Sequence, residues 1–224
     1  MSLGYRRRPI CYILQLAYKS WSAILVWSGL LSAQLFAPNW VLRFSDEFDG
    51  KELNLARWSP HAPFARVPGV FEVSGGQLHL ASGVISTYGV FAQMYGRYEI
   101  RCRIPSGRGL RATFELMPVP QGDLPRIEIF QAAGNTPTKI SFANRWGTEQ
   151  TERSFFDSFA VSDLSEGFHT IAMEWERDHI IWSVDGKDKF QSADGVPRQQ
   201  MYLQLDGSFD IDYIRVYQHP QSER

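Results

Sequence analysis

Short runs of alternating or continuous apolar residues follow one another from Asn39 towards the C-terminus, with Gly, Pro and Asp between them. Runs of this kind, bounded by turn residues, are typical of β-strands. The pattern predicts strands at Phe71–Val73, Gln77–Ala81, Arg97–Ile104, Thr113–Met117, Arg126–Phe130, Lys139–Ala143, His169–Glu174, Ile180–Val184 and Ile211–Tyr217.

The turns between these runs favour antiparallel pairing. Asp185-Gly186 lies between Ile180–Val184 and Lys187–Phe190, and this dipeptide is typical of a hairpin with a type I′ turn. No amphipathic helix pattern of sufficient length and no internal repeat follows residue 38. Many short antiparallel strands in one domain indicate an all-β sandwich, jelly roll or barrel.

Residues 1–37 have a different character. Arg6–Arg8 precede an apolar run at residues 23–37, as in a secretory signal peptide. The run is short for a membrane span, which needs about 20 residues, but Ile10–Tyr18 could extend it into an N-terminal membrane anchor. We prefer the signal peptide, with an uncleaved anchor as the first alternative and a buried core helix as the second. Residues 38–224 are then expected to form an exported domain, with membrane contact only through the N-terminal segment.

Composition excludes several classes of protein. With 44% hydrophobic and 21% charged residues, the chain is neither disordered nor collagen-like. The net charge is −1, and the acidic excess lies in residues 38–224, so no nucleic-acid partner is expected. Cys11 and Cys102 can form neither a disulfide framework nor a cysteine zinc site. Cys102 alternates with arginines on a predicted strand, which favours a small core residue.

Several motifs occur in a fixed order along residues 40–218. They are FSDEFDG (Phe44–Gly50) followed by Trp58, YGRYEIR (Tyr95–Arg101), IPSGRGL (Ile104–Leu110), FHT (Phe168–Thr170), EW (Glu174–Trp175), VDGK (Val184–Lys187) and DYIRVY (Asp212–Tyr217). In this order and approximate spacing, the motifs resemble glycoside hydrolase family 16, of the laminarinase and lichenase type. The resemblance implies a β-jelly roll sandwich of two curved antiparallel sheets, with a glycan cleft along the concave face. This fold agrees with the strands predicted above.

The catalytic motif departs from the family pattern. The resemblance implies E-x-D-x-x-E on one strand, and the matching stretch is Arg126–Gln131, RIEIFQ. Arg126 therefore stands in the place of the nucleophile, Glu128 in that of the orienting carboxylate and Gln131 in that of the acid/base. Retaining hydrolysis needs two carboxyl groups, and neither a guanidinium nor an amide can replace them. We expect the usual hydrolysis to be absent, with Glu128 the only motif carboxylate left for catalysis.

The side-chain alternation of a strand places Arg126 and Glu128 on one face. Gln131 reaches that face only if a β-bulge resets the alternation. The resemblance implies such a bulge.

Charged residues also replace aromatic ones that the resemblance implies along the cleft. The candidate substrate-binding residues are Arg111, Glu115, Arg126, Gln131, Arg145 and Trp146. Guanidinium groups suit carboxylate or sulfate groups, which favours an acidic polysaccharide. As alternatives, Arg126–Glu128 and Arg111–Glu115 are salt bridges that fill a disused cleft, and Trp146 and Trp182 are core or rim residues.

The resemblance also implies a structural calcium site, although no cofactor is required for binding. Its matching residues are Glu47, Gly76 and Asp212, and oxygen ligands suit calcium. The alternative is that the two carboxylates only cap strands.

Three functions follow from these residues. The first is a catalytically inactive domain that binds or scaffolds a polysaccharide. The second is an active glycosidase or transglycosylase on a β-linked polysaccharide that uses Glu128. The third is a protein-interaction module with a vestigial cleft.

Overall fold

The computed structural model describes residues 40–60, 69–120 and 122–219, and these residues form an all-β domain without helices. They include no helix long and apolar enough to cross a membrane. The predicted signal peptide or anchor, at residues 1–37, lies outside the described residues.

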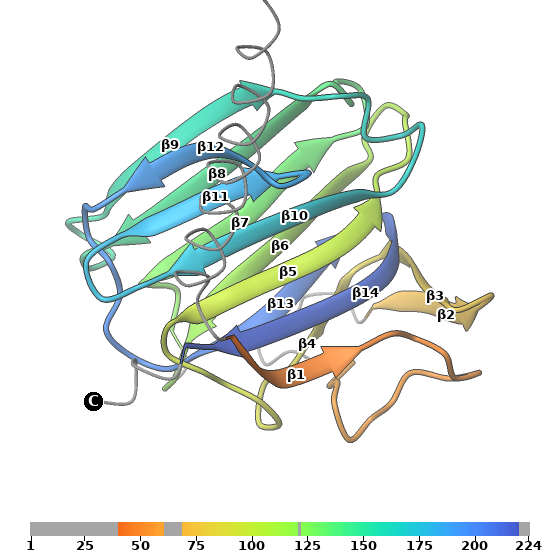
Figure 1. The fold of residues 1–224 in the computed structure, drawn as a ribbon, viewed down its shortest axis with the longest axis horizontal. Helices are drawn as coiled ribbons and strands as arrows, with labels where there is room; N and C mark the ends of the chain where they lie inside the picture. The colour runs from red at the N-terminus through yellow and green to blue at the C-terminus, as the bar shows by residue number, and fades with distance from the viewer. Residues whose placement is uncertain (1–39, 61–68, 121, 220–224) are drawn as a thin grey trace, which may run out of the picture. The chain divides into compact units, whose positions relative to one another are not determined.

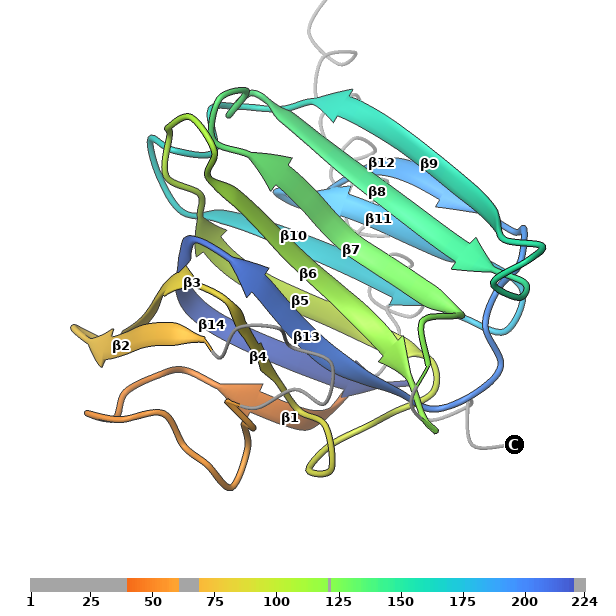
Figure 2. The ribbon, with the colours of Figure 1, turned by 180° about the vertical axis from the view of Figure 1, so that it is seen from behind.

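The described strands form two antiparallel sheets that lie face to face (Figures 1 and 2). The first has eight strands in the order β12-β11-β10-β5-β14-β3-β2, with β1 paired to β14. Its strands are β1 (Val41–Asp46), β2 (Val70–Ser74), β3 (Gln77–Ser82), β5 (Gly96–Arg103), β10 (His169–Trp175), β11 (Ile180–Val184), β12 (Lys187–Ser192) and β14 (Phe209–Gln218).

The second sheet has six strands in the order β4-β13-β6-β7-β8-β9. Its strands are β4 (Val84–Ser86), β6 (Arg111–Pro118), β7 (Arg126–Ala133), β8 (Lys139–Trp146), β9 (Arg153–Ala160) and β13 (Met201–Gly207). The two sheets make the β-jelly roll sandwich that the sequence predicted.

The core lies between the sheets because alternate residues of each strand are apolar. In β5 every second residue is buried, and Cys102 is one of them, as predicted. Trp58, Trp175 and Trp182 are among the largest fully buried side chains. Trp58 Nε1 donates a hydrogen bond of 2.8 Å to Asp46 Oδ2, so the DEF segment and the following tryptophan stabilise one another.

The predicted hairpin is also confirmed. Strands β11 and β12 pair in antiparallel fashion on either side of Asp185 and Gly186. Both turn residues have positive φ, 50° and 72°, as a type I′ turn requires.

Candidate functional site

The predicted site residues lie on the second sheet, mainly on its central strands. Phe114, Leu116 and Ile127 belong to the core. The alternation of strand side chains therefore turns their neighbours Glu115 and Arg126 to the opposite side of the sheet. We call this side, which faces away from the first sheet, the open face.

A β-bulge in β7 brings the motif residues together. Glu128 lies opposite Glu115 of β6, and Gln131 lies opposite Thr113, with a register shift between β7 and β8 from Glu128 to Gln131. The bulge inserts one residue and resets the alternation. Arg126, Glu128 and Gln131 consequently share the open face, as the sequence predicted for a bulged strand.

The bulge is anchored from the first sheet. Trp182 Nε1 of β11 crosses the core and donates a hydrogen bond of 3.1 Å to the backbone carbonyl of Glu128. Trp182 is therefore a core residue, the alternative that the sequence favoured, and it positions the strand that carries the motif.

Glu128 is held by two arginines. Arg145 Nε donates a hydrogen bond of 3.0 Å to Glu128 Oε1, and Arg126 Nη2 lies 3.7 Å from the same oxygen. The other Glu128 oxygen, Oε2, is buried and has no hydrogen-bond partner among the described residues. Arg145 Nη1 also donates to Glu152 Oε1 at 3.2 Å.

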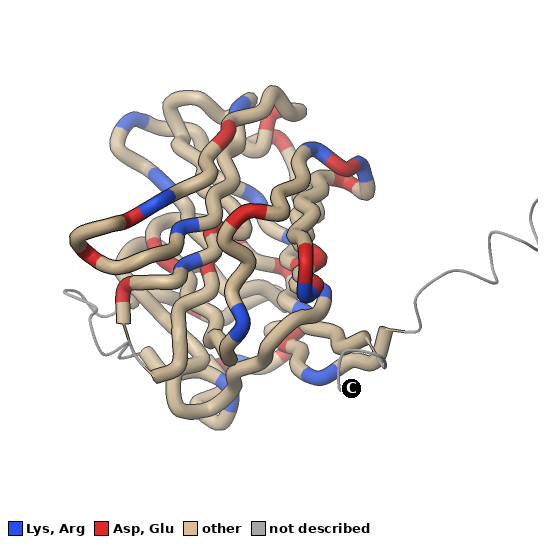
Figure 3. Tube along the Cα trace, turned by 90° about the vertical axis from the view of Figure 1, so that its left-hand side faces the viewer, with Lys and Arg blue, Asp and Glu red and all other residues tan. Residues whose placement is uncertain are grey.

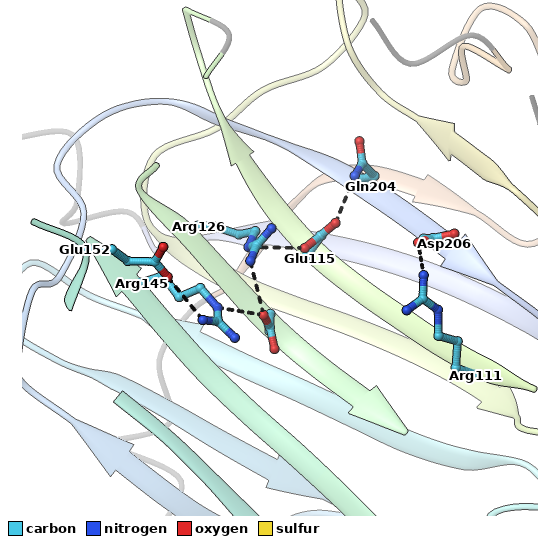
Figure 4. A network of polar contacts seen from close by, with 8 residues as sticks. Arg111, Glu115, Arg126, Arg145, Glu152, Gln204 and Asp206 are labelled. Atoms are coloured by element: carbon cyan, nitrogen blue, oxygen red, sulfur yellow. Dashed lines mark hydrogen bonds and ion pairs between the residues drawn. The ribbon is translucent and has the colours of Figure 1, made fainter. Parts of the chain in front are cut away.

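Glu115 belongs to the same polar network (Figure 4). Its Oε1 accepts a hydrogen bond of 2.8 Å from Gln204 Nε2, and its Oε2 lies 3.7 Å from Arg126 Nε. Burial raises the pKa of the Glu115 carboxyl, and the charge of Arg126 and the Gln204 hydrogen bond oppose this only in part. The Glu115 carboxyl group therefore holds its proton to higher pH than an exposed glutamate does.

Arg111 does not pair with Glu115, the salt-bridge partner considered from the sequence. Its Nη2 lies 3.6 Å from Asp206 Oδ2 of β13, not beside Glu115. Residues four apart on a strand share a face but lie about 13 Å apart along it. The alternative of an Arg111–Glu115 salt bridge is therefore wrong, whereas the Arg126–Glu128 ion pair is present.

Trp146 does not join the residues of the open face. It follows Arg145 directly in β8, so alternation turns it to the other side of the sheet. A Cβ atom at Gly195 would lie 2.0 Å from Trp146 Cδ2, which shows that the indole packs on the Gly195 backbone. This placement agrees with the core or rim alternative, and a role of Trp146 in binding stays a prediction.

The comparison with protein families decides the identity of the domain. Residues 43–207 match the model of the glycosyl hydrolases family 16. The chain belongs to glycoside hydrolase family 16.

The chain is also similar to a β-glycanase and to a glucan β-glucosidase. The chain is 33% identical over 107 residues to the endo-1,3-1,4-beta-glycanase ExsH of Rhizobium meliloti, which covers 46% of this chain and 22% of that protein. It is 25% identical over 217 residues to the glucan endo-1,3-beta-glucosidase A1 of Niallia circulans, covering 75% and 30%. The chain thus spans less than a third of the length of these relatives.

A solved structure shows the same fold. The laminarinase from Rhodothermus marinus superposes with a TM-score of 0.68 at 22% identity, covering 81% of this chain and 98% of that one. The superposition supports the family 16 jelly roll.

Both carboxylates predicted to bind calcium, Glu47 and Asp212, are paired with arginines. Arg215 Nε and Nη2 donate to the two Glu47 oxygens, both at 2.8 Å, and these bonds lower the pKa of Glu47. Asp212 forms an ion pair with Arg101. The described residues contain no group of three or more His, Cys, Asp or Glu that could hold a metal. As placed, Glu47, Gly76 and Asp212 do not fit a calcium ion, and no step below depends on one.

Sequence reasoning missed three members of the network, Glu152, Gln204 and Asp206. Gln204 and Asp206 lie on β13, which the apolar pattern did not predict. Their alternation in Met201–Gly207 was the available signal, because Leu203 and Leu205 are apolar and their neighbours polar.

Proposed function

We propose that this family 16 domain binds a polysaccharide without hydrolysing it by the two-carboxylate mechanism of retaining glycosidases. One observation carries the proposal. The bulged strand β7 presents its three motif positions on one face, but two of these positions hold Arg126 and Gln131.

The chemistry of these side chains supports the proposal. An arginine guanidinium is permanently cationic and has no lone pair to attack an anomeric carbon, and a glutamine amide has no proton to give to a leaving oxygen. Glu128 alone cannot supply both a nucleophile and an acid. The amide, guanidinium and carboxylate groups on the open face can still hydrogen-bond to sugar hydroxyls.

The relatives and the family support a polysaccharide as the ligand class. A location outside the cytoplasm belongs to the same proposal, because it rests on residues 1–37, whose basic start and apolar run resemble a signal peptide or anchor.

The test measures binding and hydrolysis with the same panel. Purified full-length protein is incubated with β-glucans, galactans and uronic-acid polymers, and reducing ends and retention on each polymer are measured. We expect retention on at least one polymer and no release of reducing ends. Release that disappears in Glu128→Gln would contradict the proposal.

A second function is favoured by one specific contact. Glu115 lies directly opposite Glu128 on the open face, and burial raises its pKa. A carboxyl group whose pKa is raised by burial beside a second carboxyl group is typical of the general acid of a glycosidase. In this alternative, Glu115 protonates the leaving oxygen while Glu128 attacks, and reducing-end release is abolished by Glu115→Gln as well as by Glu128→Gln.

A further inference from the structure

An exposed phenylalanine lies on the edge strand of the second sheet. Phe156 of β9 exposes 51% of its surface, while its neighbours Phe155 and Phe159 pack against Phe190 of β12. Phe156 therefore points to the open face, away from the core.

The register places Phe156 in one row with the motif carboxylate. Phe156 lies opposite Ala143 of β8, and Ala143 lies opposite Glu128 of β7. Glu128 and Phe156 are thus separated by two strand spacings, about 10 Å. Ala143, which has only a methyl group, stands between them in this row. The Arg145 side chain reaches the carboxylate from the neighbouring row.

Polar groups border the ring along the strands. Ser154 and Ser158 are its neighbours on the open face of β9. Ser158 Oγ lies 2.8 Å from Ser141 Oγ of β8, and Ser154 lies opposite Arg145. An aromatic surface bordered by hydroxyl and guanidinium groups offers a sugar both a stacking face and hydrogen-bond partners.

An unsatisfied atom in the same row points to a ligand. Glu128 exposes only 3% of its surface, and its Oε2 has no hydrogen-bond partner among the described residues. Buried polar atoms are normally hydrogen-bonded, so an orphan acceptor indicates a missing donor. A sugar hydroxyl is such a donor.

The charges around this row favour a neutral ligand. Arg111, Arg126 and Arg145 each lie within 4 Å of a carboxylate oxygen. A carboxylate or sulfate of an acidic polysaccharide would have to compete with these partners and would meet Glu128 at close range.

We propose that Phe156 and Glu128 form a binding subsite for a neutral hexopyranose chain. One sugar stacks its C–H face on the Phe156 ring, and a hydroxyl of the same chain donates a hydrogen bond to Glu128 Oε2. This inference rests on the proposed polysaccharide-binding function and adds to it the ligand class and the aromatic platform.

The experiment measures the affinity of the full-length chain for soluble neutral glucans and galactans, and for uronic-acid and sulfated polymers, by affinity electrophoresis. Phe156→Ala is expected to weaken binding of the neutral polymer about 10-fold, because it removes the stacking surface. Phe156→Tyr keeps the ring and should bind the neutral polymer more tightly than Phe156→Ala does. Leu55→Ala is the matched control, since Leu55 is 65% exposed on a loop outside both sheets.

Two results would overturn the subsite while leaving the proposed function intact. One is neutral binding that Phe156→Ala leaves unchanged, which would make Phe156 an ordinary exposed apolar residue. The other is retention on acidic polymers alone. A wild-type chain that no polymer retains would instead overturn the proposed function itself, and the subsite with it.

Discussion

Arg145 contacts Glu128 more closely than Arg126 does, because its Nε donates at 3.0 Å whereas Arg126 Nη2 lies at 3.7 Å. Arg145→Met removes this bond and leaves a buried carboxylate less compensated. We expect the free energy of unfolding in urea to fall by about 2–3 kcal/mol. Arg111→Met is the control, since Arg111 is 65% exposed and lies 3.6 Å from Asp206; it should change stability by less than about 0.5 kcal/mol. Equal losses in both variants would show that Glu128 does not depend on Arg145.

Glu115 makes stability depend on pH. Burial raises its pKa in the folded protein above the ordinary value of 4.5. The folded state then binds the proton more tightly than the unfolded state, so the contribution of Glu115 is fully present below pH 4.5 and is lost as pH rises through the folded pKa. Glu115→Gln keeps an acceptor for Gln204 and removes this titration. Urea unfolding is measured from about pH 4 to about pH 8, the range in which a carboxyl group with a raised pKa titrates. As the pH rises over this range, the wild type should lose stability relative to the variant. Parallel curves would contradict the raised pKa.

At the residue scale, the sequence predicted which face of a strand a side chain lies on better than it predicted which residues that side chain contacts. It placed Arg126, Glu128 and Gln131 correctly on one face once a bulge was assumed. It could not place Glu152 beside Arg145, because that contact depends on how the chain folds back between β8 and β9. It predicted Trp146 as a binding residue with a core or rim role as the alternative, and the packing of its indole on Gly195 agrees with the alternative.

Strand β7 depends on the opposite sheet for its bulge. Trp182→Phe removes the donor to the Glu128 carbonyl and leaves a buried acceptor without a partner, and Trp58→Phe removes the corresponding bond to Asp46, far along the chain from the motif. Both variants should lose about 2–4 kcal/mol of unfolding free energy, from the lost hydrogen bond and the smaller ring. Only Trp182→Phe should also weaken polysaccharide retention, because only Trp182 anchors the motif strand. Equal retention by the two variants would show that the bulge holds without Trp182.

Strands with a clear apolar alternation were predictable from the sequence, and those at the edges were not. The hairpin β11–β12 was fixed by its Asp-Gly turn, because few residues accept two positive φ angles. The edge strand β9, RSFFDSFA, is half exposed and lacks a simple alternation, so its pattern did not indicate a strand. Phe156 therefore entered the site only through the register of β8 with β9.

At the scale of the whole molecule, acidic and basic positions are interspersed along the trace of the described residues in the view of Figure 3. Coulomb steering of a charged polymer needs a surface dominated by one sign. The domain as a whole therefore agrees with its open face, where arginines and carboxylates compensate one another, in favouring a neutral ligand.

The bulged strand β7 presents its three motif positions on one face. Two of them hold side chains that differ from the family motif, so we expect the proposed inactivity to be reversible by substitution. The triple variant Arg126→Glu/Glu128→Asp/Gln131→Glu restores the family motif on the bulged strand. We expect it to release reducing ends from a neutral β-glucan at least about 100-fold faster than the wild type, because the acid/base group alone contributes about 10²–10⁴ in rate. The matched control is the double variant Arg126→Glu/Glu128→Asp, which lacks the acid and should stay near the wild-type background. A triple variant that unfolds cooperatively, binds the glucan and still releases no more product than the double variant would contradict this prediction. It would place the loss of activity in other residues of the open face, such as Arg111 and Arg145, as well as in the motif.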